Sequence, residues 1–205
     1  MAGHVGTKGV PRADREEQIL DIAGEEFGTR GYGAASIAEI AKRADVSKPL
    51  IYSYFGSRDQ LHEACVRRAG DPLVAAVAAA QIDGPAHLRA ARTLRAIFGV
   101  LEQRRYGWAV LYDPTLPGDA PAGVLAHSYR KALNEMGADG AAGVLAAAGN
   151  TDADDRSLLT RIWFGTVTAA VQWWNDHPDT SADDIAARCD RIFALLAPTA
   201  RAKSG

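Results

Sequence analysis

Apolar residues recur at intervals of three and four along most of the chain, the spacing that places them on one face of an α-helix. Sustained alternation with a period of two is absent, and no Asn-Gly or Asp-Gly pair lies between two β-branched runs. We therefore predict an all-α protein. The predicted helices span residues 14–28, 36–43, 47–55, 57–70, 87–102, 106–112, 122–136, 151–175 and 181–197.

Capping residues and helix breakers predict how the first helices begin and end. Asp14 with Glu17 has the spacing that opens a helix, and Gly28 and Gly31 are placed to end it. Pro72 is expected to kink or end the fourth helix, because proline removes a backbone donor and its ring clashes with the preceding turn, and an Ala/Val-rich segment continues to about Gln81. Residues 1–13 are Gly-rich and lack an apolar period, so we expect a disordered arm there.

Residues 36–55, SIAEIAKRADVSKPLIYSYF, predict two short helices joined by a tight turn. Ser36 and Glu39 have the spacing of a capping box, and Ser47 is placed to cap the second helix. In the turn, Asp45 tolerates a left-handed backbone better than most residues do. Two helices crossing over such a turn form a helix-turn-helix, whose second helix fits the major groove of DNA.

The stretch from about Arg15 to Val66 resembles the N-terminal domain of the TetR/AcrR family of transcriptional regulators. The family usually has Gly where this chain has Asp45, and Gly-Thr or similar where it has Pro49-Leu50. The resemblance implies a DNA-binding domain over residues 14–57 and a helical effector-binding and dimerisation domain over 58–200. The resemblance rests on these residues: Phe27 at the end of the first helix, Gly31-Tyr32, Ile40-Ala41, Val46-Ser47, Ile51-Tyr52, Phe55 and Ser57-Arg58.

Within this domain we expect Ile51 to anchor the second helix while its polar side chains face double-stranded DNA. Lys48 at the tip of that helix could reach guanine or phosphate, and helix N-termini such as that at Ser47 attract phosphate. Each charged residue could instead be an ordinary solvated one. The expected DNA-binding residues are Ser36, Lys42, Arg43, Ser47, Lys48, Pro49, Leu50, Tyr52, Ser53, Tyr54 and Arg58.

The formal net charge of −2 disfavours nucleic acid at first sight, but the charges are unevenly distributed. Residues 42–58 carry four Lys and Arg residues against one Asp, a local charge of +3. Lys8, Arg12 and Arg15 add positive charge before them, and the acidic residues of the first helix are expected to face elsewhere. DNA binding should therefore weaken strongly with salt.

Several other classes of protein are disfavoured. No apolar run approaches the length of about 18 residues needed for a membrane span, and the N-terminus lacks the apolar core of a signal peptide, so a cytoplasmic location fits best. Cys65 and Cys189 lie in apolar helical patterns and are expected to be buried free thiols. The five histidines are scattered and the common catalytic motifs are absent, so we expect no enzyme, metal or cofactor.

A regulator of this kind needs an effector site, and we expect an unknown small-molecule effector in the second domain. Residues 113–121 form a loop rich in Pro and Gly that could cover such a pocket, and Pro72 marks either a hinge or a loop boundary. Aromatic residues at helical spacing more often belong to the core than to a pocket. The candidate ligand-binding residues are Trp108, Tyr112, His127, Tyr129, Trp163 and Phe164.

The last two helices, about 154–175 and 182–197, are the expected homodimer interface. Thr151 and Ser181 begin capping patterns for them. Residues 158–174 are apolar around much of the helix, which fits either a dimer contact or the centre of a monomer. TetR-like regulators dimerise through their last two helices. We expect a homodimeric repressor released from its operator by an effector; the alternative is a helical ligand-binding dimer without specific DNA binding.

Overall fold

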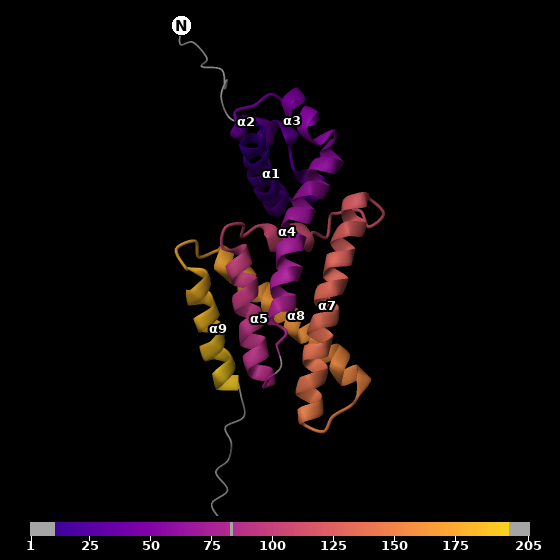
Figure 1. Cartoon of the computed structure of the whole chain (residues 1–205), viewed down its shortest axis with the longest axis vertical. Coiled ribbons are helices and arrows are strands. Elements are labelled where there is room, and N and C mark those ends of the chain that lie inside the picture. The colour runs from indigo at the N-terminus through magenta and orange to yellow at the C-terminus, as the bar shows by residue number, and fades with distance from the viewer. Residues whose placement is uncertain (1–10, 83, 197–205) are drawn as a thin grey trace, which may run out of the picture. The chain divides into compact units, whose positions relative to one another are not determined.

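The computed structural model describes residues 11–82 and 84–196, and every regular element in those ranges is a helix (Figure 1). The predicted all-α class is confirmed. Most of the arm predicted for residues 1–13 lies outside the described residues. The helices are α1 (Arg12–Ala34), α2 (Ile37–Arg43), α3 (Lys48–Phe55), α4 (Arg58–Ala80), α5 (Ala86–Leu101), α6 (Gly107–Leu111), α7 (Pro121–Ala147), α8 (Ala153–Asn175) and α9 (Ala182–Leu196).

Contacts divide the chain into two compact units that do not follow chain order. The first unit consists of the residues up to Gly70 together with Tyr106–Ser128, and the second of Asp71–Arg105 together with the residues from Tyr129 onward. Helices α4 and α7 therefore each contribute to both units. The functional division predicted at residues 57 and 58 stays a prediction.

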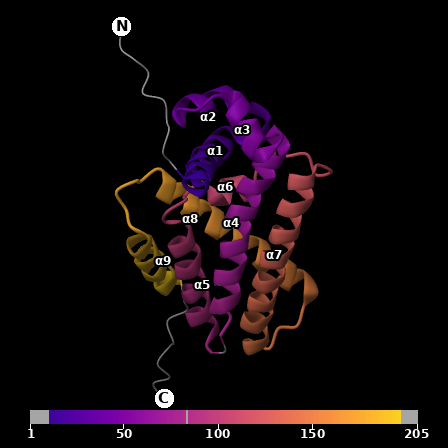
Figure 2. The ribbon, with the colours of Figure 1, turned by 45° about the horizontal axis from the view of Figure 1, so that its top comes forward.

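The first unit has its core where α1, α2 and α3 meet (Figure 2). Ile19 and Phe27 of α1, Ile40 of α2 and Ile51 of α3 are all at most 1% exposed. These are the positions that the spacing of three and four residues assigned to the buried faces. Burial of a side chain of this size typically contributes about 1.5–3 kcal/mol, which fixes the short helices α2 and α3 against α1.

Helix α1 is longer than the predicted 14–28 at both ends. It begins at Arg12 after Pro11, so Asp14 lies in the first turn instead of capping it, where its charge still suits the helix dipole. It ends at Ala34, with a kink at Gly31, whose φ of 74° lies in the left-handed region that glycine adopts readily. The helix passes through Gly28, but its regular geometry is interrupted at Gly31 as predicted, and a short helical segment continues to Ala34.

The prediction that Pro72 ends or interrupts a helix is wrong, because α4 continues through it from Arg58 to Ala80. Leu73 and Val77 after the proline are nearly fully buried, and this packing offsets the lost hydrogen bond. The loop-boundary reading of Pro72 is thereby excluded. Helix α7 likewise continues through its Gly-rich end, where a methyl group at Gly137 would lie 2.8 Å from Phe164 Cε2.

In the second unit, α5 and α9 lie side by side (Figures 1 and 2). The fully buried rings of Phe98 and Trp174 meet edge to face with centroids 5.4 Å apart. The capping residue of α8 lies one position later than predicted, because Asp152 instead of Thr151 accepts hydrogen bonds from the first-turn amides. The predicted cap of α9 is confirmed: Ser181 Oγ accepts from the Asp184 amide at 3.1 Å.

Candidate nucleic-acid interface

The connection between α2 and α3 has the predicted turn. Asp45 has a φ of 51°, the one positive φ of a non-glycine residue within the described ranges. The Ser47 hydroxyl accepts a hydrogen bond from the Leu50 amide at 3.3 Å, and Pro49 lies in the first turn of α3, where its missing donor costs nothing. The turn therefore fixes how α3 leaves α2.

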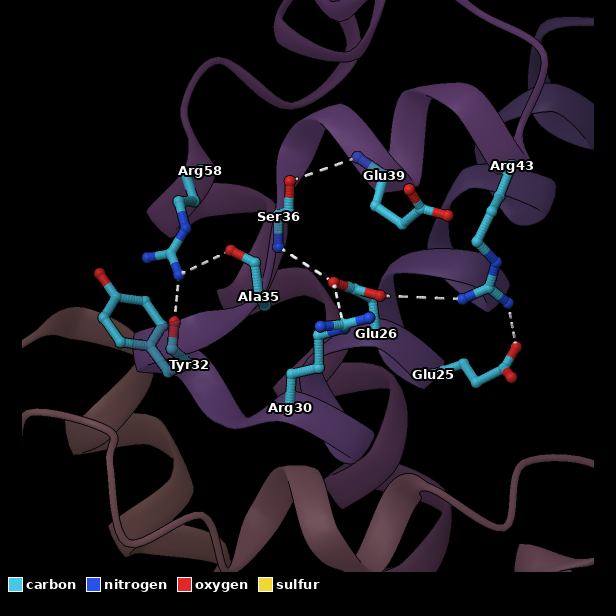
Figure 3. Close-up of polar contacts among 9 residues, drawn as sticks. All are labelled: Glu25, Glu26, Arg30, Tyr32, Ala35, Ser36, Glu39, Arg43 and Arg58. Carbon is cyan, nitrogen blue, oxygen red and sulfur yellow. Dashed lines mark hydrogen bonds and ion pairs between the residues drawn. The ribbon is translucent and has the colours of Figure 1, made fainter.

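The capping box predicted for α2 is half present. Ser36 Oγ accepts from the Glu39 amide at 3.3 Å, but the Ser36 amide donates to Glu26 Oε1 of α1 at 3.1 Å instead of to Glu39 (Figure 3). Glu26 is 4% exposed and also pairs with Arg30 at 3.1 Å. A buried carboxylate that accepts from an amide and an arginine is satisfied, so Glu26 joins the start of α2 to α1.

The outer edge of α3 is open to solvent. Ile51 is fully buried, whereas Tyr52 is 42% and Leu50 37% exposed. Of the remaining residues, Lys48, Pro49 and Ser53 are exposed and Tyr54 is half-buried. A helix with one buried anchor and a continuous polar and aromatic outer edge has the form of a recognition helix for the major groove.

The two arginines among the predicted DNA-binding residues, Arg43 and Arg58, are engaged inside the first unit (Figure 3). The Arg43 guanidinium pairs with Glu25 and lies 3.9 Å from Glu26, so acids of α1 face this region, contrary to the prediction. Arg58 donates to the Tyr32 and Ala35 carbonyl oxygens and lies 4.3 Å from the Tyr32 ring centroid. Their charges are thus partly committed to holding α1, α2 and α4 together.

A loop distant in sequence binds the last residues of α1. The Tyr32 amide donates to Asp113 Oδ2 at 2.5 Å, and the Gly33 amide donates to Thr115 Oγ1 at 3.1 Å. A methyl group at Gly31 would lie 2.9 Å from the same Thr115 oxygen. The first residues of the predicted lid loop therefore hold the end of α1, a role that the separation of some eighty residues concealed.

His62 of α4 is fully buried beside these residues. Its ring lies 4.4 Å from the Phe27 centroid and 5.1 Å from the Tyr32 centroid, and neither ring nitrogen has a hydrogen-bond partner among the described residues. Burial lowers the pKa of His62 to about 4, against a smaller opposing effect of Asp113. The imidazole is therefore neutral at physiological pH.

The six candidate ligand-binding residues fall into separate groups. In the first unit, the buried Trp108 stacks on Tyr112 with centroids 4.5 Å apart, and His127 is exposed. The second unit holds Tyr129, whose hydroxyl donates to Asp71, and the half-buried Trp163 and Phe164, which face Gly137 of α7.

Further features of the described residues concern membranes, metal ions and thiols. No helix in the described ranges is long and apolar enough to cross a membrane, and no cluster of three or more His, Cys, Asp or Glu side chains there could hold a metal ion. Cys65 and Cys189 are free and buried as predicted, and burial raises the pKa of Cys65 to about 12. Large apolar residues remain exposed on the last two helices: Leu158, Ile162, Trp173, Ile192 and Leu195.

Comparison with known proteins agrees with this geometry. The family model "Bacterial regulatory proteins, tetR family" matches residues 19–65, from the core of α1 into α4. The chain carries the TetR-family N-terminal domain. A curated relative, the HTH-type transcriptional activator FasR of Mycolicibacterium smegmatis, is 39% identical over 107 residues, 51% of this chain and 48% of FasR. The chain thus spans about half the length of that relative.

Solved structures extend the TetR-like fold to nearly the whole chain. A TetR-like transcriptional regulator from Rhodococcus sp. RHA1 is 28% identical, with a TM-score of 0.67 over 93% of this chain and 100% of that one. AibR, solved in complex with isovaleryl coenzyme A and operator DNA, is 17% identical, with a TM-score of 0.69 over 87% of this chain and 97% of its own. At that identity the likeness to AibR shows the fold alone.

Proposed function

We propose that this protein is a sequence-specific, DNA-binding transcriptional regulator that acts as a homodimer and responds to a small-molecule effector. The observation that supports this most directly is the solvent-exposed edge of α3, held on a TetR-family domain by the buried Ile51. We also propose a cytoplasmic location and no catalytic role.

On DNA, α3 enters the major groove and its outer edge meets bases and backbone. Lys48 contacts guanine or phosphate at the helix tip, while Pro49, Leu50 and Ser53 face the base edges. The Tyr52 and Tyr54 hydroxyls, Lys42 and the serines at the two helix starts, Ser36 and Ser47, contact phosphates. Arg43 and Arg58 act chiefly by positioning α2 and the start of α4, since their guanidinium groups already bind within the unit.

A second copy of the chain completes the DNA-binding surface. A single helix-turn-helix reads a short half-site, and dimers of such domains bind half-sites about 34–36 Å apart on one face of the duplex. The exposed apolar residues of α8 and α9, of which Leu195 is 85% exposed, supply the surface that two copies would bury against each other. We place the homodimer interface there.

The effector is proposed to bind within the helical domain over residues 58–200 and to release the protein from DNA, as a repressor. AibR was solved with isovaleryl coenzyme A, which makes acyl-CoA thioesters the first compounds to test. Isovaleryl coenzyme A should raise the melting temperature and lower DNA affinity, with free coenzyme A as the control. No change in either quantity argues against this class of effector. The sign of regulation is open to the same assay, since FasR is an activator.

The main test separates the regulator from the alternative, a ligand-binding dimer without specific DNA binding. The full-length protein selects duplexes from a random pool, and the affinity for the selected duplex is compared between wild type, Lys48→Ala and Lys131→Ala. Lys131 is an exposed residue of α7 that pairs with Glu135 at 3.8 Å, so it serves as the control. Lys48→Ala should cost about 1–3 kcal/mol of specific binding. Equal binding of every duplex by all three proteins would favour the alternative.

A further inference from the structure

The charges of the first unit differ in how they are satisfied. Within the described residues of this unit, Arg30, Arg43, Arg67 and Arg68 pair with carboxylates, Arg15 is buried against Gln18, and Arg58 binds backbone carbonyls. Three basic side chains there, Arg12, Lys42 and Lys48, have no acidic or carbonyl partner. All three are exposed. The uncompensated positive charge of the unit is therefore carried by these three residues.

Arg12, the first residue of α1, lies over the recognition helix. Its guanidinium carbon is 4.7 Å from the centroid of the Tyr54 ring. A cation over an aromatic face is held by attraction to the ring, and all five N–H donors of the guanidinium stay available. The ring thus orients Arg12 without neutralising it.

Because the Arg12 guanidinium lies at Tyr54, the positions of Tyr54 and Lys48 on α3 indicate how far apart the two positive charges are. The two residues are six positions apart on α3, which corresponds to about 9 Å along the helix axis. Two cations this far apart can contact different phosphates of the same duplex. Arginine suits such a contact because its planar fork can bind a phosphate through two parallel hydrogen bonds.

We infer that Arg12, presented by the ring of Tyr54, is a further DNA-backbone contact of this protein. The inference rests on the proposed function and changes which positively charged residues are expected to face DNA. The cations that face DNA are Arg12, Lys42 and Lys48, whereas Arg43 and Arg58 serve the fold. Tyr54 then has two tasks, since its hydroxyl is placed for phosphate and its ring carries the guanidinium of another helix.

The test measures the salt dependence of binding by the full chain. The dissociation constant is determined at about 50–300 mM salt for the selected duplex and for a mixed-sequence duplex, with wild type, Arg12→Gln, Tyr54→Leu and Tyr54→Phe. Arg67→Gln is the matched control, because Arg67 is exposed and pairs with Glu63 at 3.0 Å on α4. Melting temperatures show that each variant is folded.

Losing one phosphate contact lowers the log–log salt slope by about 0.9 per protomer and weakens binding roughly eightfold per protomer at 0.1 M salt. We expect this change for Arg12→Gln on both duplexes, because a backbone contact carries no sequence information. Tyr54→Leu should reproduce part of it, Tyr54→Phe should keep the Arg12 part of the slope, and Arg67→Gln should behave as wild type. Adding Tyr54→Leu to Arg12→Gln should cost less than its effect alone, because the two residues act as a pair.

The inference is overturned if Arg12→Gln keeps the wild-type slope on both duplexes, or if Arg67→Gln lowers the slope equally. A protein that selects no sequence refutes the proposed specific function, yet the mixed-sequence duplex still decides the role of Arg12. A wild-type protein that binds neither duplex refutes both.

Discussion

The buried imidazole of His62 predicts that acid destabilises the first unit. Its pKa is about 4 in the folded chain and about 6.5 in the unfolded one, because burial among Phe27 and Tyr32 disfavours the charged ring. Asp113 and Asp59 oppose this shift, and Arg58 adds to it. Below pH 6.5 the unfolded chain therefore binds a proton that the folded chain does not. Stability is full above that pH and falls as the pH is lowered towards 4.

The size of the effect follows from the two pKa values. A pKa difference of about 2.5 corresponds to about 3.4 kcal/mol of unfolding free energy, all of which is lost once the pH is below both pKa values. About 2.6 kcal/mol of this is already lost at pH 4.5. This is a large share of the stability of a typical domain. Carboxylates also titrate in this range, so the contribution of His62 has to be isolated by substitution.

The assay is urea denaturation of the full chain at pH 7.5 and pH 4.5, followed by circular dichroism. His62→Leu removes the titrating group and places an apolar side chain in the same space. His127→Gln, on the exposed part of α7, is the control. Wild type and His127→Gln should lose about 2.6 kcal/mol more than His62→Leu between the two pH values. If all three lose the same amount, the account of His62 as a desolvated neutral ring is wrong.

Two further predictions concern the backbone and the proposed dimer. Gly31→Ala should lower the free energy of unfolding by about 1–3 kcal/mol in the same assay, because φ at Gly31 is 74° and the new methyl group would press on Thr115. Gly165→Ala in α8 is the control. A methyl group there has no neighbour within 4 Å, so this substitution should be neutral or stabilising. Ile192→Glu on α9 should convert the dimer to monomer in sedimentation experiments, whereas Val124→Glu on α7 should not, although both side chains are more than half exposed. Unchanged sedimentation of Ile192→Glu would move the interface elsewhere.

Sequence patterns predicted the features whose determinants lie close together in the chain. The turn at Asp45, the cap at Ser47 and the anchor Ile51 lie within seven residues, and each acts through its own helix or turn. Their chemistry is local, so spacing alone is informative. The same holds for Cys65, whose burial follows from its place on the apolar face of α4.

The features that were missed depend on partners distant in sequence. The Ser36 amide donates to Glu26 and not to Glu39 as predicted, and Asp113 accepts a hydrogen bond from the Tyr32 amide, 81 positions away. Glu26 lies on the buried face of α1, seven residues after Ile19, but the spacing does not reveal that its partners are Ser36 and Arg43 of later segments. The prediction at Pro72 was wrong because proline usually breaks a helix, whereas tertiary packing keeps α4 continuous here. Arg12 was counted with the arm because its partner, Tyr54, comes 42 residues later.

The glycines of α1 have a consequence for engineering. A methyl group at Gly24 would lie 2.3 Å from the Tyr106 ring, and one at Gly28 would lie 2.7 Å from Tyr106 Cβ. Residues 1–70 expressed alone would lack Tyr106 beside Gly24 and Gly28, and the Tyr32 and Gly33 amides would lose Asp113 and Thr115. Chimeras that exchange operator preference between homologues should therefore transplant residues 106–115 together with the N-terminal helices.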